Sequence, residues 1–254
     1  MLAKAPYCLP EVGSAESLGI VVTGGASGIG RALAFAAADA GAHVVVCDVD
    51  EAAMNAVKAR NARIETLHLD VGDRDAVFAA FARIETKHGR IDGLVCGAAI
   101  QPRNFIHAMP PDEWQRVMRI NLDGVVWCYQ AAIGGMIKRR RGSIVAFTSG
   151  LAHQGWPQAS AYAATKGALI AFIKSAAKEV VQHRVRVNLI SPGVIETPQY
   201  RAANDGADHE KWRASIGVGQ PEDVVGPLLF LLSDAASMTA SVLSRDLAYP
   251  VQDD

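Results

Sequence analysis

The chain lacks the features that mark several large classes of protein. It has 25 lysines and arginines against 26 aspartates and glutamates, so it offers no excess of one charge to nucleic acid or to an acidic membrane surface. No stretch reaches the roughly 18 consecutive apolar residues of a membrane span. Residues 1–17 lack the apolar stretch of a signal peptide, and we treat them as an N-terminal extension. The sequence therefore predicts neither a nucleic-acid nor a membrane partner.

Cysteine and histidine are also sparse. The four cysteines lie far apart, without a CxxC motif or a metal-ligand spacing, and the seven histidines are scattered. We therefore expect no metal site, and we interpret the cysteines as reduced core residues of a cytoplasmic protein rather than as disulfide partners. The cysteines are Cys8, Cys47, Cys96 and Cys128.

Apolar residues, in contrast, make up 50% of the chain, against 20% charged residues. This composition supports a large buried core and excludes a disordered chain. From Leu18 onward, short and continuously apolar runs alternate with helical segments, which is typical of a doubly wound parallel sheet with helices on both faces. We predict one α/β domain over residues 18–254. Its expected strands are 18–23, 43–48, 64–69, 91–96, 143–148 and 185–190, and its expected helices are 31–40, 51–60, 73–88, 111–138, 161–182 and 221–232.

One segment interrupts this alternation. Residues 194–219 are polar and irregular and contain Asn204-Asp-Gly206. An irregular connection of this length inside a compact domain is usually functional. We interpret it as a substrate lid, with a plain surface insertion as the alternative.

A glycine-rich turn joins the first predicted strand to the first helix. Its sequence is Thr23-Gly-Gly-Ala-Ser-Gly-Ile-Gly30, in which Gly28 and Gly30 permit a tight turn and the close approach of a pyrophosphate. The helix that follows directs free N–H groups and a partial positive charge at such phosphates. The alternative is an ordinary turn between a strand and a helix.

Asp48 ends the second predicted strand, 18 residues after Gly30. A carboxylate at this place accepts hydrogen bonds from the ribose hydroxyls of NAD and repels the 2′-phosphate of NADP. Position 49 is valine, so no neighbouring cation attracts that phosphate. We therefore predict NAD as the cofactor. The alternative role of Asp48 is to cap the next helix, for which Asp50 competes.

A Tyr-x3-Lys pattern lies on a predicted helix. Tyr162 and Lys166 are one turn apart on the same face, and a lysine ammonium beside a phenol should lower the phenol pKa from its usual value of about 10. A tyrosine tuned in this way exchanges a proton with an alcohol or a carbonyl near neutral pH. Ser149, at the end of a strand, adds a hydroxyl for the same substrate oxygen. A half-buried surface pair is the alternative interpretation of the tyrosine and the lysine.

Together these motifs resemble those of the short-chain dehydrogenase/reductase (SDR) family in its single-domain form. The resemblance covers about residues 18–246. It implies a Rossmann-type fold and an oxidoreductase that moves a hydride between NAD(H) and a small secondary alcohol or ketone. The residues that carry it, in the family's order and spacing, are the glycine-rich turn, Asp48, Asp70-Val71, Asn121, Ser149, Tyr162, Lys166 and Pro192-Gly193.

The resemblance also implies the roles of individual residues. Tyr162 is the general acid/base, Lys166 tunes it and holds the nicotinamide ribose, and Ser149 orients the reacting oxygen. Asn121 sits at a helix irregularity and anchors a water that relays protons to Lys166, and Asp70 contacts the adenine. The residues implied to bind the cofactor are Gly24, Ser27, Gly28, Ile29, Gly30, Asp48, Asp70, Val71, Gly97, Ala98, Tyr162, Lys166, Pro192, Gly193, Ile195 and Thr197.

The chain departs from the family pattern at two places. Cys96-Gly-Ala-Ala99 stands where the family usually has Asn-Asn-Ala-Gly. Cys96 cannot replace the hydrogen bonds of the first asparagine, and Ala99 adds a methyl beside the adenosine ribose, so we expect weaker cofactor binding. Near the C-terminus Asp246 matches the family, but the usual glycines after it are missing, which puts a subunit contact there in doubt.

The substrate pocket is expected at the carboxyl ends of the strands. Loops there carry Arg103, a partner for a carboxylate, together with His153, Gln154 and Trp156. This mixture favours a small polar substrate such as a sugar, a polyol or a hydroxy acid. We interpret the basic run at residues 138–141 as a solvated helix end, where cations complement the helix dipole.

Two other functions remain as alternatives. One is a non-catalytic NAD(P)-binding regulatory protein on the same scaffold, and the other is a scaffolding subunit of an oligomer. The intact Ser149, Tyr162 and Lys166 disfavour both. The resemblance further implies a homotetramer in which helices 111–138 and 161–182 pair between subunits. The expected apolar seam contains Val125, Val126, Trp127, Ala168 and Phe172.

Overall fold

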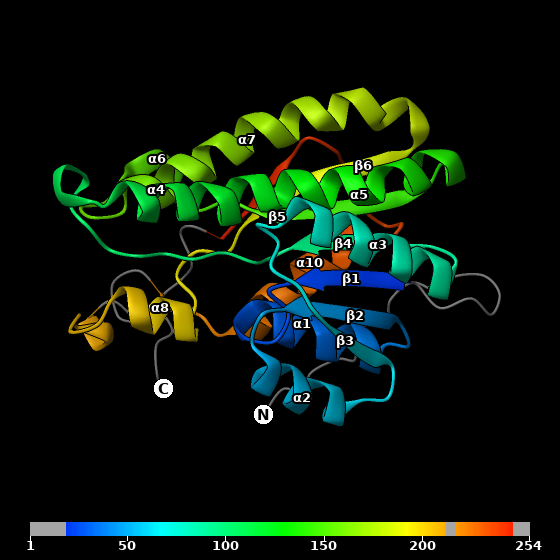
Figure 1. Ribbon diagram of the computed structural model, residues 1–254, viewed down its shortest axis with the longest axis horizontal. Coiled ribbons are helices and arrows are strands. Elements are labelled where there is room, and N and C mark those ends of the chain that lie inside the picture. Colours follow the sequence, from blue (N-terminus) through cyan, green and yellow to red (C-terminus); the bar gives the residue numbers. More distant parts are fainter. Residues whose placement is uncertain (1–18, 212–216, 246–254) are drawn as a thin grey trace.

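A seven-stranded parallel sheet forms the centre of the computed structural model, which describes residues 19–211 and 217–245 (Figure 1). The strands lie in the order β3-β2-β1-β4-β5-β6-β7. The predicted doubly wound α/β sheet is therefore confirmed, whereas the extension 1–17, Cys8 and Asp246 lie outside the described residues. The strands are β1 (Gly19–Thr23), β2 (His43–Asp48), β3 (Ile64–His68), β4 (Gly93–Cys96), β5 (Gly142–Phe147), β6 (Val185–Ser191) and β7 (Val242–Ser244).

The order of the strands reverses at β1. The chain first builds outward from β1 to β3, and β4 then pairs with the other edge of β1. In register, Thr23 at the end of β1 lies opposite Cys47 of β2 and Cys96 of β4, so the carboxyl ends of three strands are level. A crevice for a ligand forms at such a switch point.

Helices cover both faces of this sheet (Figure 1). Successive residues of β1 alternate between two buried clusters, Val21 in one and Ile20 and Val22 in the other, which explains why the strands are continuously apolar. Among the described residues, no helix is long and apolar enough to cross a membrane. One face carries α3 (Arg74–His88), α4 (Pro111–Met118), α5 (Gly124–Arg139) and α7 (Ser160–Val180), and the other carries α1 (Gly28–Asp39), α2 (Glu51–Arg60) and α10 (Val225–Leu232).

Local capping sets the ends of several helices. The Asp50 carboxylate accepts a hydrogen bond from the Ala53 N–H at 2.9 Å and begins α2, and Asp73 caps α3 in the same way. The capping role that was the alternative for Asp48 therefore falls to Asp50. At its other end α3 stops at Gly89, which has a left-handed φ of 76°.

The prediction of one continuous helix over residues 111–138 is wrong, because the helix is interrupted in its middle. A π-helical turn, Arg119–Asp123, separates α4 from α5. Within it, the side chain of Asn121 bonds both the N–H and the carbonyl of Ile100, each at 2.8 Å. This tie to the loop after β4 depends on tertiary contact, so helical periodicity alone does not reveal it. The resemblance did imply an irregularity at Asn121.

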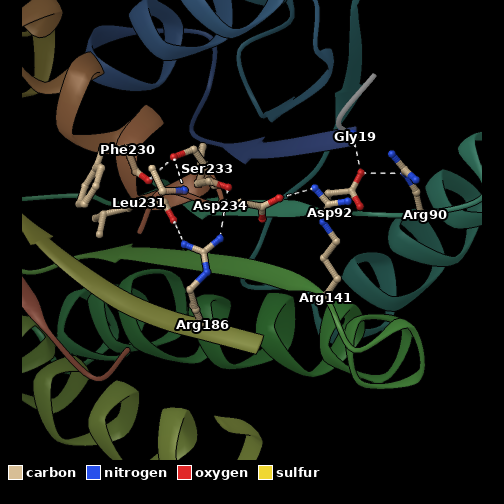
Figure 2. A network of polar contacts seen from close by, with 11 residues as sticks. Gly19, Arg90, Asp92, Arg141, Arg186, Phe230, Leu231, Ser233 and Asp234 are labelled. Atoms are coloured by element: carbon tan, nitrogen blue, oxygen red, sulfur yellow. Dashed lines mark hydrogen bonds and ion pairs between the residues drawn. The ribbon is translucent and has the colours of Figure 1, made fainter. Parts of the chain in front are cut away.

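The basic run at residues 138–141 lies at the end of α5, and Lys138 and Arg140 are exposed, so the predicted solvated helix end is borne out for these two residues but not for the other two. Arg139 donates to the carbonyl of Ile91 at 2.7 Å, just before β4. Arg141 pairs with Asp234 at 2.8 Å, within a network of polar contacts that Figure 2 shows. These guanidiniums connect the end of α5 to neighbouring elements, because the helix ends beside the amino ends of the strands.

The predicted lid segment is partly regular. Thr197 caps a short helix, α8 (Pro198–Ala203), by accepting a hydrogen bond from the Tyr200 N–H at 3.1 Å. The two ends of the segment are joined, because Glu196 donates its N–H to the carbonyl of Gly219 at 2.8 Å. The segment therefore leaves and re-enters the fold at one place, at the carboxyl end of β6.

Candidate active site

A cavity of about 740 Å³ opens at the carboxyl ends of the strands, where the strand order reverses. Its lining comes from the turn after β1, the end of β2, the loops after β3, β4, β5 and β6, the start of α7 and the lid segment. Every residue that the resemblance implied for cofactor binding lines this one cavity. The structure thus brings together residues that are far apart in the sequence.

The glycine-rich turn needs two of its glycines for close packing. Gly24 has a φ of +65°, and a Cβ there would lie 2.6 Å from the main-chain nitrogen of Ala98. A Cβ on Gly30 would collide with the carbonyl oxygen of Gly24. Helix α1 begins at Gly28, within this motif, and its N-cap residue Ser27 makes no side-chain capping bond. The first N–H groups of α1 therefore suit the pyrophosphate of a dinucleotide.

Asp48 lies at one edge of the cavity with its carboxylate held in place. One oxygen accepts the N–H of Ala26 in the glycine-rich turn at 3.0 Å, and the other accepts the N–H of Val49 at 2.8 Å. This second oxygen also accepts the N–H of Asp50 at 3.2 Å, so the oxygen bonded to Ala26 keeps a further acceptor position for a ribose hydroxyl. Val49 is 59% exposed and carries no charge. This edge is the place from which the sequence predicted NAD, and the choice between NAD and NADP stays a prediction.

Asp70 and Val71 follow β3 at the same end of the cavity. The Asp70 carboxylate accepts the N–H of Gly72 at 2.8 Å and pairs with Arg119 at 3.2 Å. Val71 is buried and packs against Gly124, where a Cβ would lie 2.7 Å from a methyl of Val71. Asp70 thus links the wall beside the predicted adenine position to the π-helical turn.

The three residues proposed for proton transfer meet at the opposite end. Ser149 follows β5, and Tyr162 and Lys166 lie in the first turns of α7. The hydroxyls of Ser149 and Tyr162 share a hydrogen bond. The buried Lys166 ammonium lies 5.5 Å from the centre of the Tyr162 ring and donates to the carbonyl of Phe147 at 2.9 Å. The arrangement presents a proton donor and a second hydroxyl to the cavity.

The expected lowering of the Tyr162 pKa is wrong for this structure. Burial raises the pKa of Tyr162 to about 12, although the hydrogen bond to Ser149 and the charge of Arg103 pull it down. Burial also lowers the pKa of Lys166 to about 8. Both shifts have one cause, because a poorly solvated wall disfavours the phenolate as well as the ammonium. Near neutral pH Tyr162 is therefore a neutral phenol, the form that donates a proton.

Asn121 does not line the cavity among the described residues. Its side-chain amide is engaged with the main chain of Ile100, as described above, and lies 3.5 Å from the Thr165 hydroxyl. It therefore positions the loop after β4 against α7. The water-anchoring role that the resemblance implied stays a prediction.

Cys96 stands where the family usually has an asparagine, and it lies in the core. It is buried at the end of β4, where it hydrogen-bonds the thiol of Cys128. Burial raises the pKa of the nearby Cys47 thiol to about 12. The prediction of reduced core cysteines is confirmed for these three residues, all of which are buried and free of disulfides.

The substrate residues divide into two groups. Arg103, Gln154 and Trp156 line the cavity, but His153 is exposed and does not. The reason is that His153 lies in a single helical turn, α6 (Leu151–Gln154). Residues three apart in such a turn share a face, so the two ends of α6 face the cavity and His153 faces away. His153 as a substrate ligand therefore stays a prediction, one that the lining of this cavity does not support.

Four residues of the predicted lid line the same cavity. The sequence argument placed part of the substrate pocket in this segment but did not name these side chains individually. They stand on and after α8, whose start is marked in the sequence by the pair Thr197-Pro198, a typical helix N-terminus. The four residues are Gln199, Tyr200, Asn204 and Lys211.

Comparison with known proteins establishes the family. The sequence model of the short chain dehydrogenase family matches residues 19–208. The chain is 37% identical over 238 residues to cis-4-hydroxycyclohexanecarboxylate dehydrogenase of Sinomonas cyclohexanicum, covering 90% of this chain and 95% of that protein. It is 36% identical over 235 residues to 3-oxoacyl-(acyl-carrier-protein) reductase of Chlamydia pneumoniae, covering 89% of this chain and 94% of the relative. The chain therefore belongs to the short-chain dehydrogenase/reductase family, whose members bind a nicotinamide cofactor.

A solved structure shows the same arrangement of the chain. The 3-ketoacyl-(acyl-carrier-protein) reductase of Brucella melitensis, in complex with NADH, superimposes with a TM-score of 0.84. The match covers 94% of this chain and 100% of that chain at 25% identity. The Rossmann-type fold of this chain is thus the fold of SDR enzymes.

Proposed function

We propose that the protein is an NAD-dependent oxidoreductase that interconverts a small secondary alcohol and its ketone. The observation that carries this proposal is the convergence of Ser149, Tyr162 and Lys166 on a cavity whose other end is built by the glycine-rich turn and Asp48. Family membership supports the reaction class, and the complex of a related structure with NADH supports the choice of cofactor. Bound nicotinamide supplies or accepts the hydride.

The residues of this chain supply the proton and the orientation. In reduction, the neutral Tyr162 hydroxyl donates its proton to the carbonyl oxygen, and the Ser149 hydroxyl donates a hydrogen bond to the same oxygen. Lys166, still largely protonated below its pKa of about 8, stabilises the phenolate that forms. In oxidation the same groups act in reverse. We further propose that residues 18–254 form one catalytic domain, with residues 194–219 as its substrate lid.

The substrate that we propose is small and polar: a sugar, a polyol or a hydroxy acid. The relative from Sinomonas cyclohexanicum is named for a ring alcohol that bears a carboxylate, which agrees with the last of these classes. The test is a panel of sugars, polyols, hydroxy acids and steroids with NAD, followed by the absorbance of NADH. Turnover of at least one compound is expected. Binding of NADH without turnover of any compound would instead favour the non-catalytic, regulatory alternative.

The rate of alcohol oxidation should rise with pH, and the rate of carbonyl reduction should fall. Oxidation delivers a proton to the site that Tyr162 and Lys166 share. As the pH rises through about 8, Lys166 loses its proton, so the site accepts one more readily. Initial rates in both directions between about pH 6 and pH 10 check this. An oxidation rate that decreases across this window contradicts the proposed proton path.

We also propose that the chain forms a homotetramer, with one correction to the expected seam. Val125 is only 4% exposed and packs in the chain's own core, so it is not available to a partner. The seam that remains consists of the half-buried Val126, Trp127, Ala168 and Phe172 on α5 and α7. Light scattering at micromolar concentration should give a mass near four chains. A monomer at that concentration contradicts the proposal.

A further inference from the structure

Arg103 lines the cavity, and one nitrogen of its guanidinium group has no hydrogen-bond partner. Its Nε donates to the carbonyl of Ala203 at 3.0 Å, and its Nη2 donates to the side-chain oxygen of Asn204 at 3.0 Å. The remaining nitrogen, Nη1, is shielded from solvent and has no hydrogen-bond partner. A buried N–H of a charged group is costly to leave unpaired, so this nitrogen needs an acceptor.

The surroundings of Arg103 favour an acceptor with negative charge. Among the described residues that line the cavity, the carboxylates are Asp48 and Asp70. Both follow strands on the β2–β3 side of β1, whereas Arg103 follows β4 on the other side. The lid adds the cationic Lys211 to the lining. The described lining on the β4 side of β1 thus has positive charge and no carboxylate.

The guanidinium is also close to the reacting centre. Its charge is one of the influences that lower the pKa of Tyr162, and both residues line the same cavity. The two bonds to Ala203 and Asn204 hold the plane of the guanidinium, so little rotational freedom is left to lose when a ligand binds. Arg103 is therefore a preorganised donor within reach of the proposed substrate.

We propose that Arg103 binds a carboxylate of the substrate, so that the substrates are hydroxy acids and the corresponding keto acids. This inference rests on the proposed oxidoreductase function. Because Nη1 is shielded, the side chains that cover it must shift to admit a carboxylate oxygen, which then satisfies Nη1 with a charge-assisted hydrogen bond, roughly twice as strong as a neutral one. The same contact fixes where the alcohol carbon lies relative to Tyr162, because a substrate held at its acid group has one orientation in the cavity.

The test compares hydroxy acids with their own methyl esters as substrates of the enzyme with NAD. Suitable pairs are 3-hydroxybutyrate, lactate and cis-4-hydroxycyclohexanecarboxylate, each beside its ester. For the wild type we expect kcat/KM to favour the acid by about 10- to 100-fold, or about 1.4 to 2.8 kcal/mol. Arg103→Met should remove most of this preference. Because the ratio is measured within one enzyme preparation, the fraction of folded protein cancels.

Two further variants separate charge from structure. Arg103→Lys keeps a cation and should retain part of the preference for the acid. Arg201→Met removes a guanidinium from α8 that pairs with Glu196 and does not line the cavity, so it should keep the acid-to-ester ratio within about threefold of the wild type. If Arg201→Met loses the preference as fully as Arg103→Met does, the preference reflects the overall charge of the lid rather than a contact with Arg103, and the inference is wrong.

A binding measurement separates this inference from the proposed function. Calorimetry with cyclohexanecarboxylate and cyclohexanecarboxamide, at saturating NAD, should show tighter binding of the acid to the wild type and no such difference for Arg103→Met. If no alcohol is oxidised but this difference is seen, the carboxylate site stands and the proposed function fails. If alcohols are oxidised while acids and esters react equally well, the carboxylate site is overturned and the proposed function stands.

Discussion

Replacing Tyr162 by phenylalanine should reduce turnover by about 100- to 10,000-fold, while NADH still binds. The change deletes one hydroxyl and keeps the ring, so the packing of α7 should survive. The lost hydroxyl is the group that shares a hydrogen bond with Ser149 and faces the cavity. Steady-state rates with a confirmed substrate, together with a fluorescence titration of NADH, measure both parts of the expectation.

Tyr129→Phe is the matched control for this prediction. It deletes the same atom from a core tyrosine of α5, whose hydroxyl donates to the carbonyl of Ala176 at 3.3 Å, away from the cavity. It should cost about 1 kcal/mol of stability and leave turnover nearly unchanged. Lys166→Met, in contrast, should weaken both turnover and cofactor binding. Wild-type turnover by Tyr162→Phe would show that another group transfers the proton.

The double variant Asp48→Ser, Val49→Arg should reverse the choice of cofactor. In the wild type, the Asp48 carboxylate faces the predicted position of the adenosine ribose, where NADP carries its 2′-phosphate. Two unit charges about 4 Å apart repel by about 4 kcal/mol at an effective dielectric constant near 20, and solvent at the cavity edge reduces this. We expect the wild type to prefer NAD by about a hundredfold or more. The new arginine binds two phosphate oxygens at once and should favour NADP.

Asp50→Ser controls for the loss of a negative charge near the same turn. Asp50 caps α2 two residues after Asp48, does not line the cavity, and serine is also a good capping residue. The ratio of kcat/KM for NAD and NADP should therefore stay close to that of the wild type. A wild type that prefers NADP, or a double variant whose ratio does not move toward NADP, would show that Asp48 does not select the cofactor.

Much of the fold could be predicted because its information is local. Strands β1, β2, β4, β5 and β6 are buried on both faces of the sheet. Such a strand has a continuously apolar sequence, which can be recognised without knowing the tertiary structure. The three-residue strand β7 was not among the six predicted strands. It is too short for a pattern, and it exists because Val242 pairs beside Leu189 of β6.

The chemistry of the candidate site was only partly predictable. A sequence motif identifies the reacting side chains, but it does not show how deeply they are buried or which charges lie beside them. Tyr162 and Lys166 were identified from their spacing, yet the direction of the tyrosine pKa shift was wrong, since burial outweighs the hydrogen bond to Ser149 and the charge of Arg103. Arg103 and His153 looked equivalent as loop residues. Packing places the first inside the cavity wall and the second in solvent.

By itself the sequence determined the class of fold, the alternation of strands and helices along the chain and the residue types available at the carboxyl ends of the strands, because hydrophobic pattern and motif spacing lie along the chain. The tertiary structure alone decided the contacts of Asn121 with Ile100, the arginine contacts at the end of α5 and the unpaired nitrogen of Arg103. Each of these depends on which distant segment lies opposite a side chain, and therefore on how much water and which partners that side chain keeps.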